Sequence, residues 1–430
     1  MRRLMLCLAI LGAWATCAPA QTRDVRIDIR SGLGRRIPVR CEPLQPAGDR
    51  EARNWSVQAD EVLADDLDHS AVFSVNRSWQ PLTGSPDVQA VVRGKWTLRG
   101  SEVRFSGEVR DVPGLRPILV REYRGPLREW RDLVHQFADD VVLQFTGELG
   151  IARTRIAFVG KVGQASELFV MDVDGAAVRQ LTSDGSIALS PAWSPEGSLI
   201  LFTSFRAGGG PKIYVISATG GKPFLVSGRP GNNTSPVYSP DGREIACTLS
   251  ADGNPEIYRL DARGGSPRRL TNNRAIDTSP SWSPTGQEIA FTSDRTGSPQ
   301  VYLMDRDGGN VRRLTYEVDY TDSPVWSPKG DRIAFVSRTG GGFDIYVCRA
   351  DGTGLQLVVG GGSNDNPHWS PDARHLVFTS GLGEARALFV TDLDDRPPRR
   401  LDTGGRVALS PAWSPRLGGL GSAQNVNVGP

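Results

Sequence analysis

Apolar residues in the C-terminal two thirds of the chain occur in short runs that return at a regular interval. One segment of the form Ser-Pro-x-Trp-Ser-Pro-x-Gly occupies residues 279–286. Related segments begin at Ser190, Ser235, Ser323, Asn366 and Ser410. The starts lie 43 to 45 residues apart, a period typical of four-stranded β-propeller blades. We therefore expect one blade per repeat.

Each repeat predicts four strands. The first contains the Trp and ends at a turn with Pro and Gly. The second is a continuous apolar run, such as 289–292, which indicates a strand buried on both faces. The third, such as 300–304, leads into an Asp-Gly hairpin turn. The fourth, such as 312–315, is short and basic, and charge on an outer strand opposes edge-to-edge pairing.

The two ends of the repeat region predict how the ring closes. The first apolar strand, 155–159, has no Trp strand before it, and the last Trp strand, 410–415, has no apolar strand after it. We expect these two segments to share one blade. The sequence thus predicts a mainly β protein, with a six-bladed propeller over 153–415 and a flexible tail over 416–430.

Residues 21–150 lack the repeat and predict a small α/β domain. We expect one helix at 59–68 and another at 130–147, where Trp130, Val134, Phe137 and Val141 recur at helical spacing. Strands are expected at 24–29, 71–75, 87–92, 96–98, 103–109 and 119–123.

Residues 1–20 are typical of a cleaved secretory signal peptide. Arg2 and Arg3 precede an apolar run at 4–15, and small residues follow at 18–20. That run is shorter than the roughly 20 residues that a membrane-spanning helix needs. Cleavage before Cys17, as in a lipoprotein, is the weaker alternative. We expect an exported chain that begins at Gln21.

Composition excludes several classes of function. The 50 Lys and Arg residues nearly balance the 48 Asp and Glu residues, which argues against a nucleic-acid partner. Beyond the signal peptide only Cys41, Cys247 and Cys348 remain, an odd number that does not make a full disulfide framework. We interpret Cys247 and Cys348 as buried apolar substitutes.

Motifs for catalysis or metal binding are not found in the sequence. It contains neither Gly-x-Ser-x-Gly nor His-Glu-x-x-His. Asp-x-Asp-Gly at 172–175 and 305–308 could suggest calcium, but the further oxygen ligands are missing and hairpin turns explain the pattern better. We expect no enzymatic activity, no cofactor and no metal.

The order of these parts resembles a known family. A signal peptide, a domain of about 130 residues and six Trp-containing blades are similar to the TolB family of the periplasmic Tol–Pal system. Segments 153–158 and 291–302 look like family sequence as well. The blade motif alone is less specific, since tricorn-type and dipeptidyl-peptidase propellers share it.

The resemblance implies a non-enzymatic, monomeric hub in the periplasm. It would bind the lipoprotein Pal at the propeller mouth and TolA through its N-terminus, and so support outer-membrane integrity, protein transport and constriction at cell division. Other outer-membrane lipoproteins, porins and colicin-type toxins would be further partners. A propeller hydrolase and a small-ligand sensor are the alternatives.

Two segments are candidate partner-binding sites. The loops that enter the Trp strands, and those between second and third strands, should open on one face of the ring, because they join strand ends of the same polarity. Their polar rim comprises Asn232, Asn233, Thr234, Asp277, Thr278, Asp294, Arg295, Thr321, Asp322, Asp365 and Asn366. For any one of these residues, turn formation is an equally good explanation. The resemblance assigns the rim to Pal.

The second candidate is an N-terminal arm at 21–32, which the resemblance assigns to TolA. Its alternating residues are Asp24, Val25, Arg26, Ile27, Asp28 and Ile29. Such a segment can add as a strand to a partner's sheet, or it can form the first strand of the N-terminal domain. Both interpretations remain open.

Overall fold

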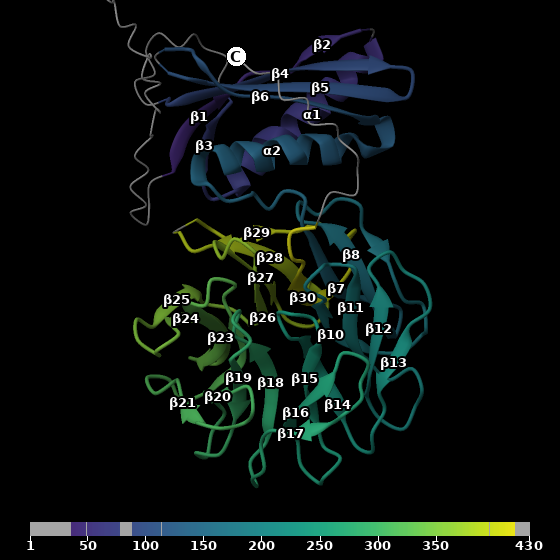
Figure 1. Cartoon of the computed structure of the whole chain (residues 1–430), viewed down its shortest axis with the longest axis vertical. Coiled ribbons are helices and arrows are strands. Elements are labelled where there is room, and N and C mark those ends of the chain that lie inside the picture. The colour runs from purple at the N-terminus through teal and green to yellow at the C-terminus, as the bar shows by residue number, and fades with distance from the viewer. Residues whose placement is uncertain (1–35, 49, 78–87, 113, 395, 418–430) are drawn as a thin grey trace, which may run out of the picture. The chain divides into compact units, whose positions relative to one another are not determined.

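The computed structural model describes residues 36–48, 50–77, 88–112, 114–394 and 396–417. Contacts group the chain from Leu33 onward into one compact unit. Its described residues form one sheet in the N-terminal region and six four-stranded sheets after it (Figure 1). This confirms the predicted fold class. No helix in the described ranges has the length and apolar character needed to cross a membrane.

The N-terminal sheet has the strand order β3-β1-β4-β5-β6, and β2 also pairs with β4. β1 runs parallel to β3 and β4, whereas β4, β5 and β6 form an antiparallel meander. The strands are β1 (Ile37–Cys41), β2 (Gln45–Ala47), β3 (Phe73–Asn76), β4 (Ala90–Arg99), β5 (Glu102–Asp111) and β6 (Pro117–Pro126). The strand predicted at 24–29 lies outside the described residues.

β4 is one strand, not the two predicted at 87–92 and 96–98. Gly94 lies in the predicted gap between those strands, but it continues the ladder opposite Gly107. A Cβ at Gly94 would come within 2.7 Å of the Ser106 carbonyl oxygen. Gly94 therefore permits a close approach of two strands and does not make a turn.

Two helices pack on one face of this sheet. α1 (Arg50–His69) begins well before the predicted start at residue 59. Its first turns bury only small side chains such as Ala52 and Ser56, so the apolar pattern that predicts a helix is weak there. A 3-10 turn, η1 (Leu127–Glu129), precedes α2 (Trp130–Thr146). α2 ends as predicted at Gly147, whose φ of 76° is the left-handed conformation that closes helices.

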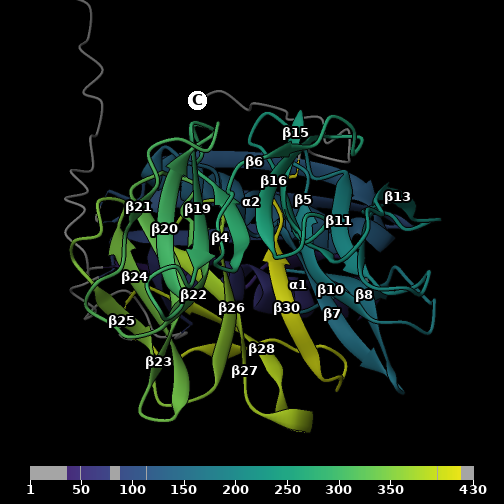
Figure 2. The same ribbon diagram turned by 90° about the horizontal axis from the view of Figure 1, so that it is seen from below.

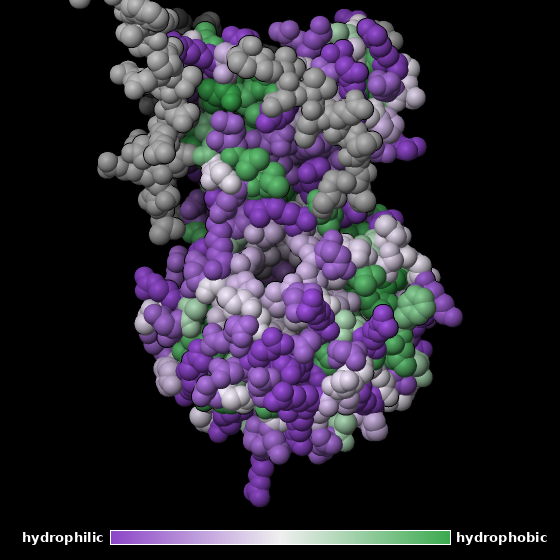
Figure 3. Space-filling model, in the orientation of Figure 1, coloured by the Kyte–Doolittle hydropathy of each residue, from purple (hydrophilic) through white to green (hydrophobic). Residues whose placement is uncertain are grey.

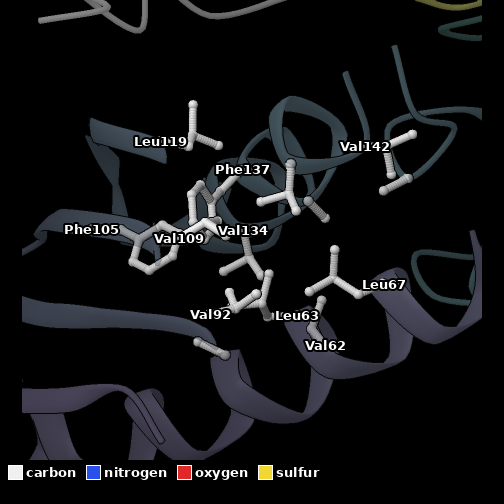
Figure 4. Packing of buried hydrophobic residues seen from close by; sticks show 14 of the residues in the cluster. Val62, Leu63, Leu67, Val92, Phe105, Val109, Leu119, Val134, Phe137 and Val142 are labelled. Carbon is white, nitrogen blue, oxygen red and sulfur yellow. The ribbon is translucent and has the colours of Figure 1, made fainter. Parts of the chain in front are cut away.

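The helices bury a continuous apolar core against the sheet (Figure 4). α1 contributes Val62, Leu63 and Leu67, and α2 contributes Val134 and Phe137. A Cβ at Gly107 of β5 would lie 2.5 Å from the Phe137 ring. The absence of a side chain at Gly107 thus lets α2 lie directly on the sheet.

Five of the six propeller sheets are made from consecutive strands. The first sheet contains β10 (Ala188–Trp193), β11 (Leu199–Ser204), β12 (Lys212–Ser217) and β13 (Phe224–Ser227), and the second contains β14 (Asn233–Tyr238), β15 (Glu244–Leu249), β16 (Glu256–Asp261) and β17 (Arg268–Arg269). The third contains β18 (Asp277–Trp282), β19 (Glu288–Ser293), β20 (Gln300–Asp305) and β21 (Arg312–Arg313), and the fourth contains β22 (Thr321–Trp326), β23 (Arg332–Thr339), β24 (Gly342–Arg349) and β25 (Gln356–Val359). The fifth contains β26 (Asn364–Trp369), β27 (His375–Ser380), β28 (Ala387–Asp392) and β29 (Arg399–Arg400), with a 3-10 turn, η2 (Gly383–Ala385), between β27 and β28.

The sixth sheet takes strands from both ends of the repeat region, as predicted. It has the order β30 (Ala408–Trp413), β7 (Arg155–Val162), β8 (Ala165–Asp172) and β9 (Arg179–Gln180). Trp413 lies opposite Ile156, and its indole N–H donates to Thr154 Oγ1 at 2.8 Å. The Trp193 indole N–H donates to the Ala412 carbonyl at 2.9 Å, which ties β30 to the next blade.

The second and third strands of each blade are buried, as their apolar sequences predict. Cys247 and Cys348 are buried and, like Cys41, unpaired. Burial raises the pKa of each of these thiols to about 12, so none is a reactive thiolate at neutral pH. The predicted short basic outer strand is found in most blades but not in β13 and β25, which are longer and expose Phe224, Leu225 and Leu357.

Candidate functional site

The six innermost strands, β10, β14, β18, β22, β26 and β30, surround a central channel. Figure 2 shows β10, β22, β26 and β30 toward the middle of the ring and β13, β21 and β25 at its periphery. The channel holds a cavity of about 480 Å³, lined by the Ser-Pro-x-Trp-Ser-Pro segments of every blade. All six repeats therefore contribute to a single site.

The two sets of predicted rim loops meet on one face. Each sheet is antiparallel throughout, so the start of its first strand and the end of its second strand lie together. The Ile276 backbone N–H donates to Asp294 Oδ1 at 2.8 Å, and Arg295 Nη2 donates to Asp277 Oδ2 at 2.9 Å. These contacts join the loop that enters β18 to the loop after β19.

Three predicted rim residues are buried at the first position of their strands: Asn233, Asp277 and Thr321. Asn233 Oδ1 accepts hydrogen bonds from Ser227 Oγ at 2.7 Å and from the Arg229 backbone N–H at 3.1 Å. Its side-chain amide donates to the Arg229 carbonyl at 2.9 Å. Asn233 thus holds the loop before β14 in place.

Asp277 and Thr321 also bond within the ring. Asp277 Oδ2 accepts a hydrogen bond from Asn273 Nδ2 at 2.8 Å in addition to Arg295. Thr321 Oγ1 accepts one from the Val301 backbone N–H at 2.9 Å. The guanidinium of Arg295 stacks 4.9 Å from the centre of the Tyr302 ring. These residues therefore support the rim from within the ring.

In each of the six innermost strands the first residue is buried and the second is half-buried. The type of this second residue divides the entrance into three sectors. The six residues, in blade order, are Leu409, Leu189, Thr234, Thr278, Asp322 and Asp365. Because consecutive repeats form neighbouring blades, two leucines, two threonines and two aspartates stand side by side. The entrance is therefore apolar, then hydroxyl-bearing, then acidic around its circumference.

The two aspartates of the acidic sector are held by hydrogen bonds from their own strands and, for Asp322, from the adjacent blade. Asp322 Oδ1 accepts hydrogen bonds from Thr292 Oγ1 of the adjacent blade at 2.8 Å and from the Ser323 backbone N–H at 2.6 Å. Asp365 Oδ1 accepts one from the Asn366 backbone N–H at 2.9 Å. Burial raises the pKa of Asp365 and outweighs the Asn366 backbone hydrogen bond and the Arg386 guanidinium, which lower it; the Asp322 carboxylate adds to the rise. Two close carboxylates favour a cationic or donor group between them.

Sequence reasoning overlooked a ring of backbone positions just inside the entrance. Ser190, Ser235, Ser279, Ser323, Asn366 and Ser410 all precede a proline and have φ between 48° and 54°. Only Asn366 was among the predicted rim residues. A residue other than glycine seldom adopts this left-handed conformation, and such strain collects at functional sites. The signal in the sequence was the repetition of a small polar residue before the first proline of each motif.

The remaining predictions are placed as follows. Asn232 is exposed, and its backbone accepts a hydrogen bond from the Ser250 N–H at 3.0 Å. The N-terminal arm, 21–32, lies outside the described residues. Asp172 and Asp305 each accept a hydrogen bond through the backbone from the glycine three residues later, as the turn interpretation predicts. Among the described residues, no group of three or more His, Cys, Asp or Glu could hold a metal ion.

Known proteins resemble the chain in both sequence and fold. The family model described as the TolB beta propeller domain matches residues 142–417. The Tol-Pal system protein TolB of Anaeromyxobacter dehalogenans is 34% identical over 267 residues, and that of Desulfosudis oleivorans is 33% identical over 269. Each match covers 58% of this chain and 60% of the relative, so the chain spans about three fifths of these relatives.

The crystal structure of TolB from Acinetobacter baumannii aligns over more of the chain. It covers 89% of this chain and 97% of its own, with a TM-score of 0.79 and 26% identity. The likeness therefore includes the N-terminal domain as well as the propeller.

Proposed function

Because the chain belongs to the family of TolB β-propeller domains, we propose that it is a non-enzymatic hub of the Tol–Pal system in the periplasm. It binds Pal at the propeller mouth and TolA through the N-terminal arm. In this way it serves outer-membrane integrity and envelope constriction at cell division.

The observation that carries this proposal is the three-sector entrance to the channel. A protein loop offers apolar, hydroxyl and cationic or N–H donor groups together, and it can meet Leu189, Thr278 and Asp322 at once. Partner interfaces combine an apolar centre with a polar rim in this way. The supporting residues Asn233, Asp277 and Thr321 keep the entrance rigid, which lowers the entropy lost on binding.

Pal binding should depend on the acidic sector. The double variant Asp322→Asn, Asp365→Asn preserves shape and removes two negative charges. We expect it to weaken Pal binding by at least about tenfold, or roughly 1.4 kcal/mol, in calorimetric titration of the 21–430 chain. The matched control, Glu61→Gln with Asp132→Asn, removes two exposed charges from α1 and α2 and should bind Pal as the wild type does.

The result is read together with the melting temperature. Unchanged affinity in the Asp322→Asn, Asp365→Asn variant, with Pal still bound, would place the interface elsewhere. Asn233→Ala serves as the contrasting case: it should lose stability as well as affinity, because it removes the hydrogen bonds that hold the loop before β14.

TolA binding is proposed to reside in the N-terminal arm. Deleting residues 21–32 should abolish TolA binding while Pal still binds. If the truncated protein retained TolA, the assignment of the arm would be wrong.

A further inference from the structure

The N-terminal sheet has a second face, opposite the helices, that carries ordered charge. Side chains alternate between the two faces along each strand. Trp96, Phe105 and Tyr123 point into the core. Their sequence neighbours on β4, β5 and β6 therefore point outward. Figure 3 shows hydrophilic residues gathered over the ends of β4 and β5.

We call this surface the basic face, and it is defined by nine outward side chains. They are Arg93, Lys95, Arg99, Arg104, Arg110 and Arg124, with Glu102, Glu108 and Glu122. Six positive charges stand against three negative ones, which gives a net charge of +3. The whole chain is close to neutral by contrast, with 50 basic and 48 acidic residues.

The arginines of the basic face are held in place by shared carboxylates. Glu122 accepts hydrogen bonds from Arg104 Nη2 at 2.5 Å and from Arg124 Nη2 at 2.7 Å, one on each oxygen. The hydrogen bond from Arg104 is the main cause that lowers the pKa of Glu122, so this carboxylate stays ionised. Glu122 is mostly covered, whereas Arg104 and Arg124 are each about half exposed.

The same arrangement recurs on the neighbouring rows of the sheet. Glu108 accepts from Arg93 Nε at 2.9 Å and from Arg110 Nε at 2.7 Å. Each Arg–Glu–Arg group keeps one excess positive charge, and its guanidinium groups retain N–H donors that point away from the glutamate. A guanidinium fixed in this way loses little side-chain entropy when it binds an oxyanion.

Two further cations on β4 are free of such partners. Within the described part of the chain, neither Lys95 nor Arg99 forms an ion pair within 4 Å, and both are exposed, although Glu102 lies opposite Arg99 in the β4–β5 ladder. They lie beside a hollow of about 570 Å³ whose lining also includes Thr97, Arg104 and Arg124. The hollow thus has hydroxyl and cationic donors along its length.

We propose that the basic face is a docking surface for an extended, acidic segment of a partner protein. Outward residues of one strand repeat every second position, about 6.6–6.8 Å apart. An extended segment with Asp or Glu at alternate positions has the same repeat, so its carboxylates meet Lys95, Arg99 and the half-exposed arginines of the Arg–Glu–Arg groups. Charge complementarity of this kind gives specificity and speeds association.

An anionic membrane is the competing occupant, and the surface suits it less well. The three glutamates stand between the cations, where they would oppose a continuous layer of phosphates. A hollow lined by Thr97 and flanked by Glu122 fits a chain of side chains better than it fits a flat plane of headgroups. The basic face also belongs to the N-terminal domain, so this inference is independent of the propeller mouth.

The test uses a fluorescein-labelled peptide of five Glu-Thr repeats and the 21–430 chain. Fluorescence anisotropy at low ionic strength should show binding that weakens as salt is added. The variant Lys95→Gln, Arg99→Gln should weaken it at least fivefold. The control Lys222→Gln, Arg263→Gln removes two exposed charges from the propeller and should leave it unchanged. A peptide of five Lys-Thr repeats should not bind.

Each other outcome overturns the proposal. Equal weakening by the two double variants would show attraction by net charge alone, and no binding by the wild type would remove the site. Binding to phosphatidylglycerol vesicles with the same dependence on Lys95 and Arg99, without peptide binding, would assign the face to a membrane. Arg99→Gln alone, at the exposed end of β4, provides a second variant should the double variant melt at a lower temperature than the wild type.

Discussion

Removing β30 and everything after it, residues 408–430, should open the propeller. β30 completes the sheet that β7 begins, so its loss uncovers one edge of β7 along its whole ladder. It also removes Trp413, which is 3% exposed and packs with Ile156 and Phe158. An uncovered apolar edge of this kind promotes aggregation.

The magnitude follows from these contacts. Loss of a buried tryptophan costs about 3–5 kcal/mol. Thr154 loses its bond from the Trp413 indole, and Trp193 loses its acceptor on Ala412, and each unsatisfied group costs about 1–3 kcal/mol. The sum of at least about 5 kcal/mol is comparable with the whole stability of a domain, about 5–15 kcal/mol. The truncated propeller should therefore be unfolded or aggregated at 25 °C.

The control deletes only residues 418–430 and keeps the contacts of Leu417 with Gly197 and of Arg416 with the carbonyl of Leu149. Far-UV circular dichroism and thermal melts of both truncations, followed by size-exclusion chromatography, report the outcome. Trp413→Phe is an intermediate case that removes the indole N–H and part of the buried ring system, at a cost of at least about 1 kcal/mol. If the 408–430 and 418–430 deletions melt at the same temperature, closure by β30 does not stabilise the ring.

Two further predictions concern the N-terminal domain. Burial lowers the pKa of His135, but the Asp66 and Asp174 carboxylates outweigh it and raise the pKa to about 9. The stabilisation by the imidazolium is therefore complete below pH 6.5 and lost as the pH rises through 9. Between pH 6 and 10, the free energy of unfolding measured in urea should fall by up to about 3 kcal/mol more in the wild type than in His135→Gln. Parallel pH curves of the two proteins would refute this. Gly107→Ala places a Cβ 2.5 Å from the Phe137 ring and should cost about 1–3 kcal/mol by overpacking. Gly125→Ala, whose Cβ would meet Leu133 at an ordinary 3.4 Å, is the matched control, and equal melting temperatures of the two variants would contradict the close approach of α2.

The propeller could be predicted from the sequence because its repeat is long and its apolar strands are continuous. The unequal ends of the repeat, with Trp413 and Ile156 left without partners in their own units, were enough to predict the closing blade. In the N-terminal domain the same reasoning failed where side chains are small. Ala52 and Ser56 are too small to give the first turns of α1 a clear apolar pattern. Gly94 has no side chain to continue the strand pattern, although it lies within β4.

The sequence predicts which loops surround the channel entrance, but it does not predict which of their side chains are buried. Side chains point to alternate faces along a strand. Each innermost strand also carries a register shift beside its left-handed residue. Asn233 is therefore buried, whereas Thr234 beside it is half-buried. Polarity alone does not distinguish such neighbours, since both types of residue are common in turns.

The pairing of β30 with β7 has a consequence for how the protein is made. Synthesis delivers β7 first and β30 after every other strand of the ring, so the blade they share stays incomplete while the intervening blades emerge. The N-terminal sheet and its two helices have no such dependence and can form early. A chain that folds from its N-terminal end therefore exposes an open edge on β7 until β30 arrives, and an open edge can pair with another chain.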